Sequence, residues 1–102
     1  MKSSDSAVTS DGHTFRVESR WKEEVVYWEG QHGYLFDAGW GVEPPVLYVP
    51  SASMWDEVVP GWMQGRRSAI VGGLEAKSGH VLADDIHGYY RQSPESRVLR
   101  AD

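Results

Sequence analysis

The chain contains no cysteine among its 102 residues. Without a thiol, a disulfide framework, a thiolate zinc site and a catalytic cysteine are all excluded. Long apolar runs are missing as well: the longest have four or five residues, whereas a helix that spans a bilayer needs about 20. Residues 1–12 are polar, with no apolar stretch of the kind found in signal peptides. We therefore predict a cytoplasmic protein that does not bind membranes.

Positive charge is scarce. Ten Lys and Arg stand against fifteen Asp and Glu, which gives a formal net charge of −5. The deficit lies in residues 1–65, which carry four basic and ten acidic residues. Phosphate backbones repel an acidic body and prefer a basic stripe, so we predict no nucleic-acid partner. An acidic face suits a basic protein partner, although acidic surfaces also serve solubility alone.

Signatures of catalysis and of ligand binding are also missing. No serine lies in a GxSxG elbow, and Gly72-Gly73 lacks the spacing of a phosphate-binding loop. The four histidines are too scattered to supply the three or four convergent ligands of a metal site. Neighbouring carboxylates are adjacent in sequence, so their side chains diverge instead of flanking a bond. We predict no catalytic residue, no metal and no cofactor, and a protein that is not an enzyme.

Aromatic residues are abundant, with five Trp, five Tyr and two Phe. Each buried ring removes about 150–250 Å² from water, so a few rings stabilise a small core. Alternating apolar residues predict strands over 13–19 and 34–40, and short apolar runs predict strands over 21–29 and 46–49, with a turn at 30–33. Residues 80–83 add a last strand.

Apolar residues at steps of three and four predict a helix over 61–77. Gly72-Gly73 weakens it, so either the helix frays there or Gly73 permits a close approach to the sheet. The fold class predicted is α+β: an antiparallel meander of three to five strands packed on one face by one main C-terminal helix. Residues 13–90 form this single domain, 1–12 a disordered lead-in and 91–102 a flexible tail.

The tryptophans are the main candidates for a binding surface. A core position is the simpler expectation for any single one, and Trp40 and Trp62 are placed there. Trp21, Trp28 and Trp55 are harder to bury together beneath one helix, and exposed tryptophans are typical anchors of protein interfaces. Together with Arg67, they are the predicted partner-binding residues. Arg66, on the apolar stripe, is expected to lie along the helix–sheet seam and to pair with a carboxylate at its rim.

One segment resembles known proteins. In Tyr48–Arg67 a strand ending in proline leads to a Trp-bearing turn, a Pro-x-Trp helix start and an Arg-Arg pair, an arrangement similar to that of small bacterial proteins. Proteins of this size and layout resemble immunity proteins of bacterial toxin systems. That resemblance implies an acidic inhibitor that binds a cognate toxin, and it identifies no toxin-contacting residue.

Three functions are open at this point. The first is a non-enzymatic protein-binding domain, in particular an immunity-type inhibitor of a bacterial toxin. The second is a structural or accessory domain that homodimerises through its sheet. The third is a small-molecule-binding module with a pocket between helix and sheet.

Overall fold

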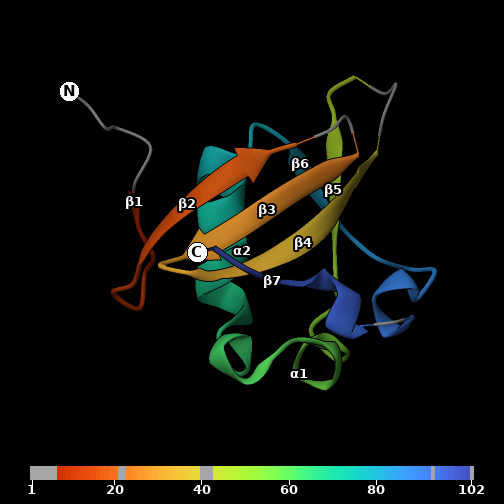
Figure 1. Cartoon of the computed structure of the whole chain (residues 1–102). Coiled ribbons are helices and arrows are strands. Elements are labelled where there is room, and N and C mark those ends of the chain that lie inside the picture. Colours follow the sequence, from red (N-terminus) through yellow and green to blue (C-terminus); the bar gives the residue numbers. More distant parts are fainter. Residues whose placement is uncertain (1–6, 21–22, 40–42, 93, 102) are drawn as a thin grey trace.

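A curled sheet with one helix behind it forms most of the molecule (Figure 1). The computed structural model describes residues 7–20, 23–39, 43–92 and 94–101. Its strands are β1 (Ala7–Val8), β2 (Thr14–Ser19), β3 (Glu24–Glu29), β4 (His32–Gly39), β5 (Val46–Val49), β6 (Val81–Asp84) and β7 (Val98–Arg100). Its helices are α1 (Trp55–Val58) and α2 (Arg67–Lys77), with 3₁₀ segments η1 (Gly61–Met63), η2 (Tyr89–Arg91) and η3 (Pro94–Arg97). The predicted α+β class, built on a sheet, is confirmed.

The sheet is mixed in strand direction. Its order is β1-β2-β3-β4-β5-β6, and β7 pairs with β4. Strands β1 to β5 pair antiparallel, as a meander requires. Strand β6 runs parallel to β5, with Leu82 opposite Leu47, because the helical segments between them carry the chain back to the end where β5 began. The predicted antiparallel meander of three to five strands is thus corrected to a mixed sheet of seven strands among the described residues.

A two-residue turn, Gly30-Gln31, joins β3 to β4 and leaves Glu29 opposite His32. Gly30 has a φ of +59°, a left-handed conformation that costs glycine little. The sequence predicted a longer turn over 30–33, but Gly33 belongs to β4. The ring of Trp28 covers Gly33, where an added Cβ would lie 2.6 Å from the indole.

Aromatic rings fill the sheet face that meets α2. Phe15 and Tyr27 stack with centroids 5.4 Å apart, while Tyr34 and Phe36 meet edge to face at 5.1 Å. The helical segments and their flanks complete this core with Met54, Trp55, Val58, Val59, Met63, Ile70 and Leu74. The aromatic content of the sequence therefore supplies much of the core, as its composition suggested.

Helix α2 approaches β2 at a glycine. An added Cβ on Gly73 would lie 2.8 Å from Cζ of Phe15, whereas nothing lies within 4 Å of one added to Gly72. The helix continues through both glycines to Lys77. Of the two alternatives drawn from Gly72-Gly73, the close approach of Gly73 to the sheet is confirmed.

The predicted single helix over 61–77 is not supported. Segment η1 ends at Met63, and α2 begins only at Arg67. Gly65 lies between them with a φ of +73°, which interrupts a right-handed helix. Its N–H donates to the Asp56 carboxylate at 2.7 Å, which fixes the interruption. The helical residues are thus divided among short segments instead of one main C-terminal helix.

The chain after β6 docks onto β4 and β5 through Tyr90 and Arg97. The buried Tyr90 hydroxyl accepts a bond from the Asp37 N–H at 2.7 Å and donates to the Tyr48 carbonyl at 2.6 Å. These are opposed residues of the β4–β5 pair. Arg97 lies over the Tyr90 ring, 4.1 Å from its centroid, and donates to the Asp37 carboxylate and the Leu35 carbonyl.

Within the predicted flexible tail, 91–102, the structure describes η3 and β7. Strand β7 pairs with the start of β4, with Leu99 opposite Gly33, while β5 pairs with the end of β4. The two strands share one edge of β4, and Arg97 and Tyr90 occupy the interval between them. The tail is ordered because its few anchoring groups find partners far away in the sequence, beside β4.

Of the predicted disordered lead-in, 1–12, the structure describes residues 7–12 and places β1 at their start. Ala7 pairs with Phe15 across the β1–β2 ladder. The Thr9 N–H donates to the His13 carbonyl at 2.8 Å, and the Thr9 hydroxyl donates to Asp11. Local hydrogen bonds therefore order residues 7–12, and residues 1–6 lie outside the described ranges.

Gly73→Ala should lower the free energy of unfolding by about 1–3 kcal/mol, the usual cost of overpacking, because its methyl group collides with Phe15. Gly72→Ala is the matched control in the same helix. Because nothing crowds this position, Gly72→Ala should raise the free energy of unfolding by about 0.5–1 kcal/mol. Urea denaturation of both variants measures the difference, and equal effects would contradict the close contact.

Tyr90→Phe should lower the free energy of unfolding by about 1–3 kcal/mol, because the Asp37 N–H and the Tyr48 carbonyl lose their partner. Tyr89→Phe is the neighbouring control, and its half-exposed ring predicts a change within about 0.5 kcal/mol. Thermal and urea denaturation compare the two. A Tyr90→Phe protein as stable as Tyr89→Phe would show that the hydroxyl bridge contributes nothing.

Candidate functional site

The structure buries two of the predicted partner-binding tryptophans. Trp55 is 1% exposed and donates its indole N–H to the Met63 carbonyl at 2.9 Å. Trp28 is 4% exposed and donates to the Glu18 carboxylate at 2.8 Å, with the Arg16 guanidinium 5.1 Å from its ring centroid. A partner would reach either ring only after rearrangement of the fold. Trp55 belongs to the main hydrophobic core, whereas Trp28 is buried outside it, with its ring against Gly33.

Arg67, the predicted polar contact, lies at the seam between α2 and the sheet. It donates to the Pro50 carbonyl at 3.0 Å and to the Asp84 carboxylate at 3.0 Å. This holds the start of α2 against the ends of β5 and β6. The fourth predicted residue, Trp21, lies outside the described residues, as does Trp40.

Arg66 forms the densest polar cluster described. Its guanidinium donates two bonds to Glu29, two to Asp11 and one to the Trp62 carbonyl, at 2.7–3.2 Å. An arginine has five N–H donors, and all five are used. The expected pairing of Arg66 with a rim carboxylate is confirmed. Because no donor is left over, this cluster is a clamp between the β1–β2 loop, the β3–β4 hairpin and α2.

Charge pairing in this clamp shifts its pKa values. Hydrogen bonds from Arg66 lower the pKa of Asp11 well below its usual range, and a hydrogen bond from the Thr9 hydroxyl lowers this pKa further. Hydrogen bonds to Glu29 and then to Asp11 raise the pKa of Arg66. Burial and a hydrogen bond to Glu29 raise the pKa of the Tyr27 hydroxyl. Every shift favours the protonation state already present at neutral pH, so the clamp is suited to structure and not to proton transfer.

Two further features bear on ligands. Within the ranges described, no group of three or more His, Asp or Glu side chains is arranged to hold a metal ion. A groove of about 380 Å³ runs between β1 and α2. Its lining consists of Ala7, Val8, Thr9, Ser10, Phe15, Ala69, Gly72, Gly73, Ala76 and Lys77. Most of these side chains are small, and the polar ones are Thr9, Ser10 and Lys77, so the groove offers few groups to orient a ligand.

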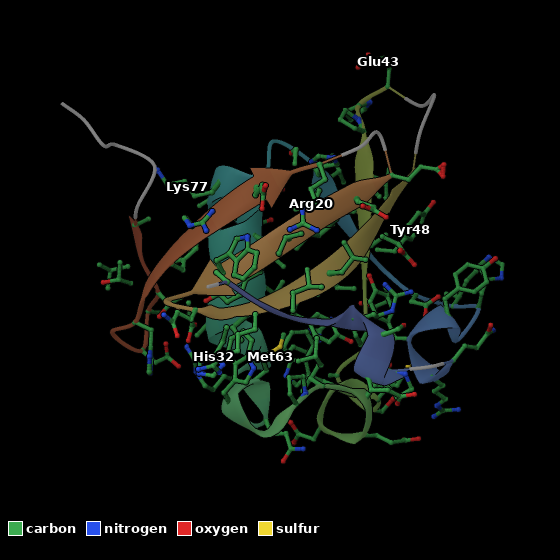
Figure 2. The ribbon with its side chains drawn as sticks, in the orientation of Figure 1. Arg20, His32, Glu43, Tyr48, Met63 and Lys77 are labelled. Atoms are coloured by element: carbon green, nitrogen blue, oxygen red, sulfur yellow. The ribbon has the colours of Figure 1, made fainter. Side chains whose placement is uncertain are left out.

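A different pocket combines aromatic rings with a carboxylate. The Tyr48 pocket, as we call it, is lined by Tyr48, Asp85, His87 and Tyr89 and has a volume of about 240 Å³. The imidazole of His87 stacks on the ring of Tyr89, with centroids 5.1 Å apart. Tyr48 belongs to β5 and lies on the same side of the view as η2 in Figure 2.

Asp85 fixes the loop that forms this pocket. It is 4% exposed, and its two carboxylate oxygens accept from the backbone N–H groups of His87 at 3.1 Å and Tyr90 at 3.2 Å. Its own N–H donates to the Val49 carbonyl at 2.8 Å. Gly88, with a φ of +72°, then turns the chain into η2. The loop is thus tied to β5 at one end and to the buried Tyr90 at the other.

The rigid loop presents apolar surface outward. Ile86 is 86% exposed, the highest value among the large apolar residues described, and Tyr89 is 48% exposed. Sequence reasoning missed this surface because it assigned no strand or helix to residues 84–90 and sought the binding surface among the tryptophans. The signal was present: an isoleucine and two tyrosines lie among turn-forming residues, too many large apolar groups for a solvated loop.

The pH dependence of stability tests the Arg66 clamp through Asp11→Asn. The pKa of Asp11 is lower in the folded than in the unfolded chain, so its contribution is complete above about pH 4 and is lost as the pH falls further. The difference in urea midpoint between wild type and Asp11→Asn should therefore be largest near neutrality and shrink from about pH 4 to pH 2. A difference that stays constant over this range would contradict the pairing.

In the described part of the chain, no helix is long and apolar enough to cross a bilayer. No protein-family model matches the sequence, and neither a curated protein nor a solved structure shows significant similarity to it. A proposal about function must therefore rest on the side chains that the structure describes.

Proposed function

We propose that this protein is a non-enzymatic protein-binding domain whose docking surface consists of Tyr48, Ile86, His87 and Tyr89. The observation that carries the proposal is the exposure of Ile86 and Tyr89 on a loop that buried groups hold in place. Tyrosine is enriched at the centres of protein interfaces, where it supplies a large contact area with few rotatable bonds. The predicted class of function is kept, and these residues take the place of the buried Trp28 and Trp55 as proposed contacts, while Trp21 stays a prediction.

The fixed loop lowers the cost of association. Ordering a flexible side chain or loop at an interface consumes binding free energy, and a surface that is already ordered avoids part of this cost. Asp85 and Tyr90 supply that order through the loop's own backbone. An exposed isoleucine on such a loop is therefore better suited to a partner's apolar hollow than one on a mobile tail.

An immunity-type inhibitor of a bacterial toxin is the more specific form of this proposal. The net charge of −5 suits a basic partner, as toxins that act on nucleic acids often are. The segment that resembles such small bacterial proteins, 48–67, begins at Tyr48, which belongs to the docking surface. Both observations support this form without naming the toxin.

Pocket size favours a protein partner over a metabolite. Small-molecule sites usually have volumes of about 300–1,000 Å³ with convergent polar groups. The Tyr48 pocket is smaller, at about 240 Å³, and the larger β1–α2 groove has only Thr9, Ser10 and Lys77 among its polar lining residues. Homodimerisation is the remaining alternative, and it predicts self-association through the same exposed residues.

Ile86→Asp tests the docking surface, with Val8→Asp as the matched control. Val8 is also exposed, at 65%, but it lies on β1, which β2, β3 and β4 separate from β5 in the sheet. Each immobilised full-length protein is incubated with extract of the native host, and the captured proteins are compared by mass spectrometry. We expect a partner retained by wild type and Val8→Asp and reduced about tenfold or more with Ile86→Asp, a loss of at least about 1.4 kcal/mol.

Two results would overturn the proposal. Identical captured proteins with all three baits would place the binding surface elsewhere. Sedimentation that shows a wild-type dimer, converted to a monomer by Ile86→Asp but not by Val8→Asp, would assign the surface to self-association.

A further inference from the structure

Asp85 is a buried carboxylate without a cationic partner among the described residues. Its neighbour Asp84 pairs with Arg67, and the ion pairs described elsewhere involve other carboxylates. In the described part of the chain, the hydrogen-bond donors to its carboxylate are the backbone N–H groups of His87 and Tyr90. Two backbone N–H bonds stabilise the charged form of a carboxylate but do not neutralise it, so Asp85 can still serve as the counter-ion of a cation that enters the pocket.

The acceptor geometry of Asp85 suits a planar cation. Each carboxylate oxygen has two acceptor sites, and each accepts one backbone N–H here. One acceptor site is left on each oxygen, and this is the arrangement that a guanidinium fills with two parallel hydrogen bonds. An ammonium group would act as a point charge and make less use of both oxygens.

The walls of the Tyr48 pocket suit the same cation. Tyr48 and Tyr89 both line it beside Asp85, and the faces of aromatic rings attract cations and stack on guanidinium planes. The imidazole of His87 stacks on Tyr89, which helps to hold that ring in place. A pocket of about 240 Å³ is matched to a single side chain.

We infer that the Tyr48 pocket binds the guanidinium of an arginine presented by the partner protein, with Asp85 as its counter-ion and the two tyrosines as its walls. This inference rests on the proposed function, since it names the group that the partner inserts beside the contact made by Ile86. It agrees with the acidic net charge of the chain, which favours a basic partner.

A small probe tests the pocket without the partner. The purified full-length protein is titrated with N-acetyl-arginine amide, and the backbone amide signals of Asp85, His87 and Tyr90 are followed by ¹H–¹⁵N NMR. We expect saturable shifts confined to this loop, with a dissociation constant on the order of 1–10 mM. N-acetyl-leucine amide and N-acetyl-lysine amide are the controls, and both should bind more weakly.

Variants separate the roles of the walls and the counter-ion. Tyr89→Leu keeps apolar bulk but removes the ring, and it should weaken binding of the arginine probe about fivefold, whereas Tyr89→Phe should retain it. Asp85→Asn should weaken binding about tenfold. Because Asp85 also holds the loop, its effect counts only if the ¹H–¹⁵N spectrum shows the loop intact, and Tyr89→Leu tests the pocket independently.

The outcomes distinguish this inference from the proposed function. No loop shifts at 20 mM arginine probe, about twice the weakest affinity expected, would overturn the guanidinium site. Shifts of equal size with the leucine probe, or equal binding of the lysine probe, would overturn it as well. In each case the effect of Ile86→Asp on partner capture would still decide the docking surface by itself.

Discussion

The hydroxyl of Tyr90 is the contact on which the arrangement of the sheet edge depends. It accepts from the Asp37 N–H and donates to the Tyr48 carbonyl, so it links β4 to β5. Burial raises the pKa of this hydroxyl, which keeps its proton available for the bond to Tyr48. Arg97 lies over the same ring and extends the contact to β7. One tyrosine thereby fixes the relative positions of three strands and of the loop that precedes it.

The Arg66 clamp has a similar role at the opposite end of β4. It joins segments that are 55 and 37 residues away in sequence, through Asp11 and Glu29. The hydrogen-bonding groups of Tyr90 and Arg66 are used almost entirely within the protein, and both side chains are largely shielded from solvent. Such fully used groups stabilise a fold but leave nothing for a ligand. This contrast distinguishes Arg66 from Asp85, whose carboxylate keeps acceptor sites open.

Sequence reasoning found the local features and missed the distant ones. Strand β5 was predicted with its observed bounds, 46–49, because a short apolar run between prolines is a local signal. The contact of Gly73 with the sheet was also foreseen as one of two alternatives. The docking of Tyr90 and Arg97 was not, because each depends on partners about 50–60 residues away, and periodicity carries no information about such pairs. Trp28 and Trp55 were placed at the surface because the sequence does not show that Gly33 and the Met63 carbonyl would receive them.

The polar group of each aromatic side chain helps to explain whether its ring lies in the interior or at the surface. An indole has one donor, and once the Glu18 carboxylate or the Met63 carbonyl accepts it, Trp28 or Trp55 is satisfied in the interior. A phenol both donates and accepts, so Tyr90 bridges two strands, while Tyr48 and Tyr89 keep their rings at the surface. The consecutive pair Tyr89-Tyr90 thus places one ring inside and one outside. The inner ring fixes the backbone from which the outer ring projects, and a partner that contacts Tyr89 therefore meets a surface already held by the core.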